Sequence, residues 1–423
     1  MRLMLFSIGS RGDAQPFAAL GLALQAQGHS AALCLPQNFE PLAQGLGLDF
    51  HGLPWDTQDA LQDGGLRSRL LRGDVIGFFH RAQAQAWSRR EALWQAMITA
   101  ARDADVLVSA STTEDLVELL GQALGKPVIQ AELAPLSPSS QFAALGVSLH
   151  SLGPLNRATH WAARLAWWRL NRAMALGLAD TLGLPRLSGS PALRALKHGR
   201  RVLHGFSPTL FEPPSDWRPA QHAVTGAWQL GAAAQSLAGD HRDAGFVHWL
   251  EDGPPAVFLS FGSMPALTGE DLLELAGDVA ETLECRMVLG LGWSQVESSD
   301  CDLPEGVALS GDCDHAWLLS RCSAVIHHGG AGSTHSAALS GLPQVVCPLF
   351  ADQPFWAERI RLQGAGLTLP FKRLDAENLA ATLSRALDER HQDAAARLAE
   401  RMQQEGGAAL AAEQLLAWSA ESA

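Results

Sequence analysis

The run HHGGAGST at residues 327–334 brings together groups that could bind a phosphate. It lies between two apolar runs, so the pattern predicts a buried strand, a small-residue turn and a helix. Glycines let backbone approach a ligand closely, and a helix N-terminus offers unpaired N–H groups at its positive end. The N–H groups from Gly330 through Gly332 to Ser333, with the His328 imidazole, would donate to the phosphate oxygens. The alternative is a tight strand-to-helix turn without a ligand.

An acid and an amide, Asp352 and Gln353, follow the next apolar run, residues 344–350. Ligands of an open α/β sheet bind outside the carboxyl ends of its strands, so this pair and the glycine turn are expected at one edge. A carboxylate beside an amide can hydrogen-bond several hydroxyl groups, as a sugar requires. The pair therefore predicts a sugar site.

A carboxylate near the start of the chain is a candidate general base. Asp13 follows an apolar run, residues 2–8, and precedes Pro16 at an expected helix start. It is therefore expected at the carboxyl edge of a first sheet, where partial burial could raise its pKa into a useful range. The alternative is an N-cap for the helix, a position that suits Asp. Arg11 could pair with Asp13 or face a diphosphate, and both interpretations stay open.

The length and composition of the chain indicate a folded protein of two domains. At 423 residues the chain is too long for one core, and 47% hydrophobic with 18% charged residues is a globular composition. The net charge of −13 argues against a nucleic-acid-binding surface. Six cysteines without a C-x-x-C pair suggest neither a zinc site nor a disulfide framework, but buried thiols in a reducing cytoplasm. No apolar run reaches membrane-spanning length, so a cytoplasmic protein is expected.

Short apolar runs alternate with helical patterns in two parts of the chain, which predicts parallel sheets covered by helices. Proline-rich and small-residue stretches between them indicate an interdomain linker. Strands are expected at residues 2–8, 31–35, 48–53, 106–108 and 127–129, then at 257–261, 287–290, 307–309, 324–326 and 344–350. The domains are expected at 1–230, for an acceptor, and 255–400, for a donor, with a linker at 231–254 and a terminal helical segment at 401–423.

Residues 150–200 differ from the rest of the chain, because they hold many aromatic and arginine residues. Trp161, Leu165 and Trp168 recur at helical spacing with arginines between them. The favoured interpretation is a helix packed on its own domain. The alternatives are an apolar wall for a substrate, or a patch that touches a membrane surface.

Four motifs together resemble one family. They are GSRGDAQPF at 9–17, FGSM at 261–264, HHGGAGST at 327–334, and GLPQVVCPLFADQPFWAERI at 341–360. The chain resembles the nucleotide-sugar glycosyltransferases with two Rossmann-like domains, in particular the sterol glucosyltransferase-like branch. The resemblance implies an α/β fold of two facing Rossmann-like domains (GT-B type), in which the terminal helix returns to the first domain.

The resemblance also implies roles for single residues. Many members of the superfamily have a histidine base at the position of Asp13, and this branch has aspartate. Gly262 and Ser263 would contact the diphosphate, and Cys313 would contribute a backbone contact to the base of the nucleotide. Asp312 stands where relatives have an aromatic residue that stacks on uracil. A ring-stacking contribution of order 1 kcal/mol to binding of the base is therefore missing. UDP and dTDP both remain open.

Three D-x-D triplets could suggest a metal–diphosphate site of another glycosyltransferase fold. They lie at Asp103-x-Asp105, Asp300-x-Asp302 and Asp312-x-Asp314. So short a pattern arises by chance, and carboxylates in solvated loops explain it better. A helix N-terminus can hold a leaving diphosphate without a cation, so we predict neither a metal nor a cofactor.

The expected reaction transfers a hexose, glucose from UDP-glucose, to a hydroxyl group of a lipophilic small molecule such as a sterol, terpenoid or polyketide. Attack opposite the diphosphate would invert the anomeric carbon. Two other classes remain. A NAD-dependent oxidoreductase would use similar sheets, but Gly9-x-x-Gly12 lacks the G-x-G-x-x-G spacing. A non-catalytic protein that binds lipids or nucleotide sugars could keep the same fold.

Overall fold

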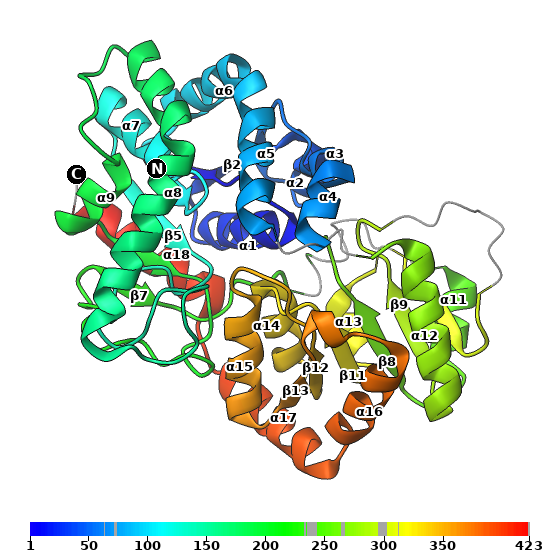
Figure 1. Cartoon of the computed structure of the whole chain (residues 1–423). Coiled ribbons are helices and arrows are strands. Elements are labelled where there is room, and N and C mark those ends of the chain that lie inside the picture. Colours follow the sequence, from blue (N-terminus) through cyan, green and yellow to red (C-terminus); the bar gives the residue numbers. More distant parts are fainter. Residues whose placement is uncertain are drawn as a thin grey trace. The chain divides into compact units, whose positions relative to one another are not determined.

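The computed structural model describes residues 1–62, 64–71, 74–231, 234, 243–263, 267–294, 303–311 and 313–421. The chain forms two compact units. Unit 1 comprises 1–208, 212–230 and 406–423, and unit 2 comprises 209–211 and 231–405. Each unit contains a parallel sheet with helices packed on it (Figure 1). This architecture confirms the predicted α/β fold of two Rossmann-like domains.

The sheet of unit 1 has seven strands in the order β3-β2-β1-β4-β5-β6-β7. Its interior strand β1 is fully buried from Leu3 to Phe6, because helices cover both faces of the sheet. The chain changes direction across the sheet between β1 and β4, where ligands of such sheets bind at the carboxyl edge. The strands are β1 (Arg2–Phe6), β2 (Ser30–Pro36), β3 (Asp49–Leu53), β4 (Val106–Ala110), β5 (Val128–Glu132), β6 (Val202–His204) and β7 (His222–Val224).

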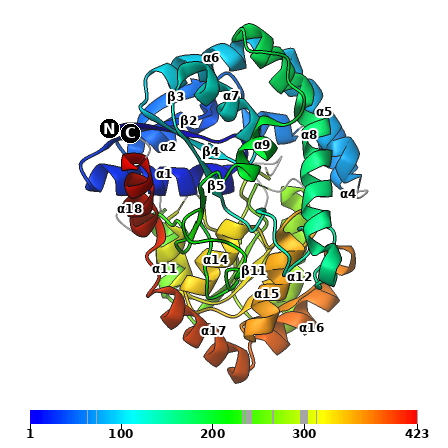
Figure 2. The same ribbon diagram turned by 90° about the vertical axis from the view of Figure 1, so that its left-hand side faces the viewer.

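The helices of unit 1 include the last helix of the chain, α18, which packs against α1 (Figure 2). Leu415 and Trp418 of α18 are buried. The α-helices are α1 (Arg11–Ala26), α2 (Glu40–Gly45), α3 (Thr57–Gln62), α4 (Gly64–Leu71), α5 (Val75–Ser88), α6 (Arg90–Arg102), α7 (Glu114–Leu124), α8 (Asn156–Thr181), α9 (Pro191–Lys197) and α18 (Gly407–Ala420), and the 3₁₀ helices are η1 (Gln37–Phe39) and η2 (Gly153–Leu155).

The sheet of unit 2 has six strands in the order β10-β9-β8-β11-β12-β13. The change of direction falls between β8 and β11, so the turns after these two strands share the carboxyl edge. The strands are β8 (Ala256–Ser260), β9 (Met287–Gly290), β10 (Val307–Leu309), β11 (Cys322–His327), β12 (Gln344–Val346) and β13 (Gly366–Thr368). The helices are α11 (Ala244–Glu251), α12 (Gly269–Leu283), α13 (His315–Leu319), α14 (Ala331–Leu339), α15 (Gln353–Gln363), η3 (Phe371–Arg373), α16 (Ala376–Ala386) and α17 (Glu389–Met402).

Two sequence expectations need correction. The segment 231–254, expected to be a linker, contains α11, whose Phe246 and Leu250 join the core of unit 2. The first helix begins at Arg11 rather than next to Pro16, because Ser10 provides its N-cap, so the proline lies inside the helix. Among the described residues, no helix is long and apolar enough to cross a membrane.

Candidate active site

The glycine turn of unit 2 joins β11 to α14 as the sequence pattern predicts. Gly329 has a φ of +88°, a conformation that favours glycine, and Gly330 is the N-cap of α14. The next three residues, Ala331 to Ser333, are partly exposed. Their N–H groups have no partner inside the helix, since the first turn of a helix has no preceding carbonyl groups. The turn therefore offers the donors and the helix dipole that an anion needs.

His328 lies between two glycines. A Cβ atom added to Gly330 would lie 2.5 Å from its Nε2 atom, and one added to Gly262 would lie 3.3 Å from its Cε1 atom. Its Nδ1 atom is buried and has no hydrogen-bond partner among the described residues. Burial lowers the pKa of His328 to about 3, with His327 contributing, so the ring is neutral at pH 7. An unpaired polar atom buried beside a helix N-terminus is a group that a bound phosphate could satisfy.

Both ring nitrogens of the neighbouring His327 form hydrogen bonds within the protein. Its Nδ1 atom accepts the N–H of Gly329 at 3.0 Å, so its Nε2–H donates to Gln344 Oε1 at 2.8 Å. The ring is buried, and burial lowers its pKa to about 4. Strand alternation turns the two histidines to opposite sides, so His327 supports the turn from within.

The turn after β8 lies beside the glycine turn, because Ser260 pairs with His327 across the adjacent strands. Gly262 has a φ of +59°, and its N–H donates to Ser260 Oγ at 3.2 Å. The Gly262 N–H is therefore engaged, while Ser263 is partly exposed. The structure thus brings the predicted residues Gly262, Ser263 and His328 together.

The start of α15 also contacts the glycine turn, since a Cβ atom on Gly329 would lie 3.1 Å from the backbone oxygen of Gln353. The side chain of Gln353 is buried, and its Oε1 accepts the N–H groups of Leu349 at 2.8 Å and Phe350 at 3.2 Å. Asp352 Oδ2 accepts the indole N–H of Trp356 at 2.9 Å. Both predicted sugar ligands thus stabilise their own turn, a role that the sequence analysis missed.

The D-x-D triplets have structural uses wherever they are described. Asp314 caps α13, with its Oδ1 accepting the N–H of Ala316 at 2.8 Å. Asp105 accepts the N–H of Arg2 at 2.8 Å, and Asp103 pairs with the Arg2 guanidinium. The positions 300, 302 and 312 lie outside the described residues. Within the described ranges, no group of three or more His, Cys, Asp or Glu residues could hold a metal ion. Cys313 is partly buried against a core cluster of unit 2.

In unit 1, Asp13 lies in the first turn of α1, just after β1. Its Oδ2 accepts the N–H of Ser10 at 2.8 Å and the Ser10 hydroxyl at 3.2 Å. Asp13 is therefore the third helical residue, and the N-cap is Ser10. The alternative prediction that Asp13 is the N-cap is thus wrong. Desolvation by burial raises the pKa of Asp13, while the two Ser10 hydrogen bonds oppose that shift. A Cβ atom on Gly9 would lie 2.2 Å from Oδ2, so the carboxylate needs glycine there. Arg11 is exposed.

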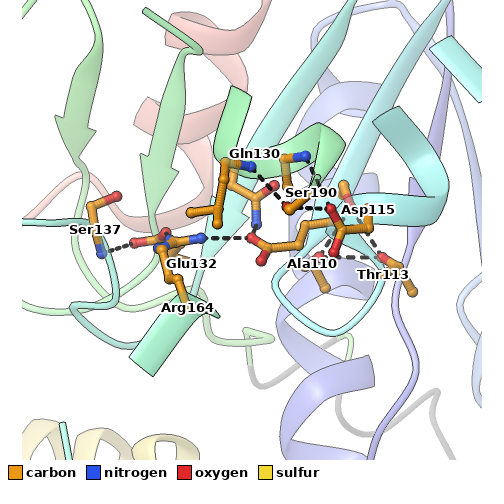
Figure 3. Close-up of polar contacts among 12 residues, drawn as sticks. Ala110, Thr113, Asp115, Gln130, Glu132, Ser137, Arg164 and Ser190 are labelled. Carbon is orange, nitrogen blue, oxygen red and sulfur yellow. Dashed lines mark hydrogen bonds and ion pairs between the residues drawn. The ribbon is translucent and has the colours of Figure 1, made fainter. Parts of the chain in front are cut away.

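A buried ion network, which the sequence analysis also missed, connects α7, β5 and α8 (Figure 3). Arg164 of α8 donates to Glu114 at 2.9 Å and to Glu132 at 2.7 Å. The second oxygen of Glu132 accepts the N–H of Ser137 at 2.8 Å. Burial raises the pKa of Glu132 to about 7, although Arg164 opposes the shift. The network fixes the carboxyl ends of β4 and β5 relative to α8.

Asp115 extends this arrangement to α9. Its Oδ1 accepts the Ser190 hydroxyl at 2.5 Å and the N–H of Ala192 at 3.0 Å. Burial raises the pKa of Asp115 to about 6, and the neighbouring Glu114 adds to the shift. Because these carboxylates are held by donors on other helices, their contacts are those of scaffold groups.

A parallel sheet with a helix start suited to anions at its switch point, in a chain with a second Rossmann-like unit, matches the architecture of the GT-B class of nucleotide-sugar transferases. Comparisons with known proteins agree. Residues 3–112 match the glycosyltransferase family 28 N-terminal domain. Residues 277–417 match the erythromycin biosynthesis protein CIII-like C-terminal domain.

Relatives cover almost the whole chain. O-mycaminosyltylonolide 6-deoxyallosyltransferase of Streptomyces fradiae is 34% identical over an alignment of 400 residues, gaps included, which covers 92% of this chain and 90% of that protein. Sterol 3-beta-glucosyltransferase UGT80B1 of Arabidopsis thaliana is 28% identical over an alignment of 437 residues, gaps included, which covers 97% of this chain and 67% of the relative. The crystal structure of glycosyltransferase VinC in complex with DTDP has a TM-score of 0.65 at 18% identity and covers 100% of both chains.

The chain belongs to the nucleotide-sugar glycosyltransferase family, in its sterol glucosyltransferase-like branch, and it is a glycosyltransferase. The family predicted from the four motifs is thereby confirmed.

Proposed function

We propose that this enzyme transfers a hexose from a nucleoside diphosphate sugar, UDP-glucose, to a hydroxyl group of a lipophilic small molecule, with inversion at the anomeric carbon. The observation that carries the proposal is the buried Nδ1 atom of His328, which lies between Gly262 and the N-terminus of α14 and has no hydrogen-bond partner among the residues that the structure describes. The names of the two relatives, which act on O-mycaminosyltylonolide and on a sterol, support a large lipophilic acceptor.

The reaction would proceed as a single displacement. The acceptor oxygen forms a bond to the anomeric carbon, and Asp13 accepts the hydroxyl proton. The bond between that carbon and the diphosphate oxygen breaks, and its electron pair leaves with the diphosphate. His328, Ser263 and the N–H groups at the start of α14 stabilise the developing charge. Asp352 and Gln353 are the candidates for the sugar hydroxyls, because their turn adjoins Gly329.

A second donor deserves a test. The relative with 34% identity is named a 6-deoxyallosyltransferase, and VinC was crystallised with DTDP. Both facts favour a dTDP-linked deoxyhexose as the alternative donor for this chain.

The direct experiment incubates the enzyme with UDP-glucose, dTDP-glucose or a dTDP-deoxyhexose and a panel of sterols, terpenoids and macrolides, in buffer containing EDTA. We expect products heavier by one glucose residue from UDP-glucose, since a helix terminus needs no cation to hold the diphosphate. Transfer only from a dTDP-sugar would replace the proposed donor. Activity that is lost in EDTA and restored by manganese would contradict the metal-free mechanism.

A non-catalytic protein or an oxidoreductase would behave differently. UDP should raise the melting temperature and NAD should not, because only a ligand of the native state stabilises it. If neither transfer nor donor hydrolysis is detected with any donor in the panel, the fold is retained without catalysis.

Replacing His328 by Ala should weaken UDP binding roughly 5- to 150-fold, the effect of losing a buried donor worth about 1–3 kcal/mol. Calorimetric titration of UDP would measure the loss. His248→Ala, an exposed histidine of α11 in the same unit, is the matched control and should bind UDP like the parent. Equal affinity of all three proteins would remove His328 from the phosphate site.

A further inference from the structure

The surface of α8 and of the loop before it is unusual for this chain. Six of the eleven large hydrophobic side chains that are exposed in the described residues lie between Val147 and Leu176. We define the α8 surface by its exposed apolar and basic side chains. They are Val147, Leu149, Leu152, Leu155, Leu165, Arg169, Arg172 and Leu176.

The exposed residues of α8 form one face of the helix. Ala158, Ala162, Leu165, Arg169 and Leu176 are exposed and follow helical spacing. The opposite face packs into unit 1 through buried residues. They are Asn156, His160, Arg164, Trp168, Met174, Ala175, Leu178 and Ala179. Figure 2 shows α8 as a long helix at the outside of this unit. The interpretation of α8 as a helix packed on its own domain thus accounts for only one of its two faces.

The charge of this segment has the opposite sign to that of the whole protein. No Asp or Glu occurs between Glu132 and Asp180, while the segment holds Arg157, Arg164, Arg169 and Arg172. The whole chain carries −13. Such a run concentrates positive charge locally, which favours an anionic partner.

The arginines differ in their availability. Arg164 is buried in its ion network, and Arg157 lies 4.0 Å from Asp216. Asp216 is also held by Ser139 and Ser140. Arg169 and Arg172 are exposed, and within the described ranges neither has a hydrogen bond or an ion pair. Their charges are therefore available to an external partner.

The neighbouring helix α5 lies on the other side of α8. α5 packs on α8 through Phe79 and Trp167, whose ring centroids are 5.6 Å apart. It contains His80 and Arg81 but no acidic residue, and Trp87 near its end is 40% exposed. Because α5 contacts the side of α8 opposite its exposed residues, these side chains are not part of the α8 surface.

We propose that the α8 surface binds the surface of an anionic lipid bilayer, with its leucines in the interfacial region and Arg169 and Arg172 against the headgroups. Lipid headgroups supply the negative charge and the adjacent apolar layer together, and the α8 surface offers complements to both. This contact is peripheral, since no helix of the described residues could span a bilayer. It does not depend on the proposed reaction, and its test measures no product.

The test is co-sedimentation of the full chain with vesicles of phosphatidylcholine containing phosphatidylglycerol, compared with phosphatidylcholine alone. We expect binding to the anionic vesicles only, weakening as salt screens the charges. Arg169→Glu with Arg172→Glu should lower the partition coefficient at least roughly 10- to 30-fold, since each basic residue contributes about a factor of five. Leu149→Ser with Leu155→Ser should also reduce binding, with less dependence on salt.

The matched control is Arg390→Glu with Arg397→Glu on α17 of unit 2, which makes the same change in net charge at exposed sites. Its vesicle binding should stay close to that of the parent, and circular dichroism should show all variants folded. Failure of the parent to bind anionic vesicles, or equal losses in the control and the α8 variants, would overturn the proposal. Size-exclusion chromatography tests whether a second copy of the chain, and not a bilayer, binds the α8 surface. A parent dimer that the α8 variants dissociate, without vesicle binding, would also overturn it.

Discussion

Asp13→Asn is expected to lower the transfer rate by about 10²- to 10⁴-fold, the usual contribution of a general base. Asparagine can still accept the Ser10 N–H and fits the same space beside Gly9, so the first turn of α1 should keep its geometry. UDP affinity should be unchanged, because the groups proposed to hold the diphosphate belong to unit 2. Steady-state kinetics with saturating donor and acceptor would measure the loss, which more of either substrate should not restore.

The pH dependence gives a second measure. Burial raises the pKa of Asp13 above its ordinary value of 3.8. The rate of the parent should therefore fall as the pH drops through that raised pKa, and the residual activity of Asp13→Asn should lack this limb. The stability of the fold should change with pH in the opposite direction to the rate. A carboxyl whose pKa is raised by folding stabilises the fold fully below 3.8 and loses that contribution as the pH rises. The Asn variant should accordingly be at least as stable as the parent at pH 7.

An Asp13→Asn enzyme within a few-fold of the parent rate, at equal stability, would show that the carboxylate serves only the first turn of α1. The base would then have to be sought among Glu114, Asp115 and the histidines of unit 1. Because Glu114 and Asp115 are already held by Arg164 and Ser190, these two acids are the weaker candidates.

Arg164→Met should destabilise unit 1 by about 3–5 kcal/mol, because it leaves Glu114 and Glu132 buried without their cation. Denaturant unfolding followed by tryptophan fluorescence would measure the loss. Arg169→Met on the same helix is the control, and as an exposed substitution it should stay within about 0.5 kcal/mol of the parent. Adding Glu114→Gln and Glu132→Gln to Arg164→Met should recover part of the stability, since no buried charge is then unpaired.

Lowering the pH should reduce the loss of stability caused by Arg164→Met. Without Arg164, the pKa of Glu132 must rise further above its unfolded value of 4.5, since the arginine opposes the effect of burial. Parent and variant share the unfolded value, so the variant loses stability relative to the parent only as the pH rises above about 7, the pKa of Glu132 in the folded parent. Below that pH the deficit due to Glu132 should shrink, because the carboxyl is protonated in both folded proteins. A deficit independent of pH would mean that lost packing, and not the unpaired carboxylates, causes the destabilisation.

The parts of the fold that could be predicted from sequence were those set by local pattern. The apolar runs before Gly9 and Gly329 are strands, and the glycines that follow give the turns. Local pattern also misled at Asp13, where proximity to Pro16 suggested an N-cap but the serine three residues earlier competes better for that position.

Long-range partnerships could not be predicted in the same way. Arg164 lies 50 residues from Glu114 and 32 from Glu132, so its burial depends on where α8 packs. An arginine at a helical spacing gives no indication of that. Gln353 has a nearer partner, because its side chain accepts the N–H of Leu349 four residues before it. A glutamine just inside a helix start could have suggested this bracing role.

The chain order of unit 1 has a consequence for synthesis. Its sheet is built from residues before 225, but α18, which packs on α1 and buries Leu415 and Trp418, begins only at Gly407. Arg201 donates to the carbonyl oxygen of Trp418, and Gln27 donates to that of Ala409. On the ribosome, the apolar side of α1 therefore stays uncovered until the whole of unit 2 has been translated and the last helix has left the exit tunnel. The nascent chain must remain soluble with that surface open, so its early domain matures last.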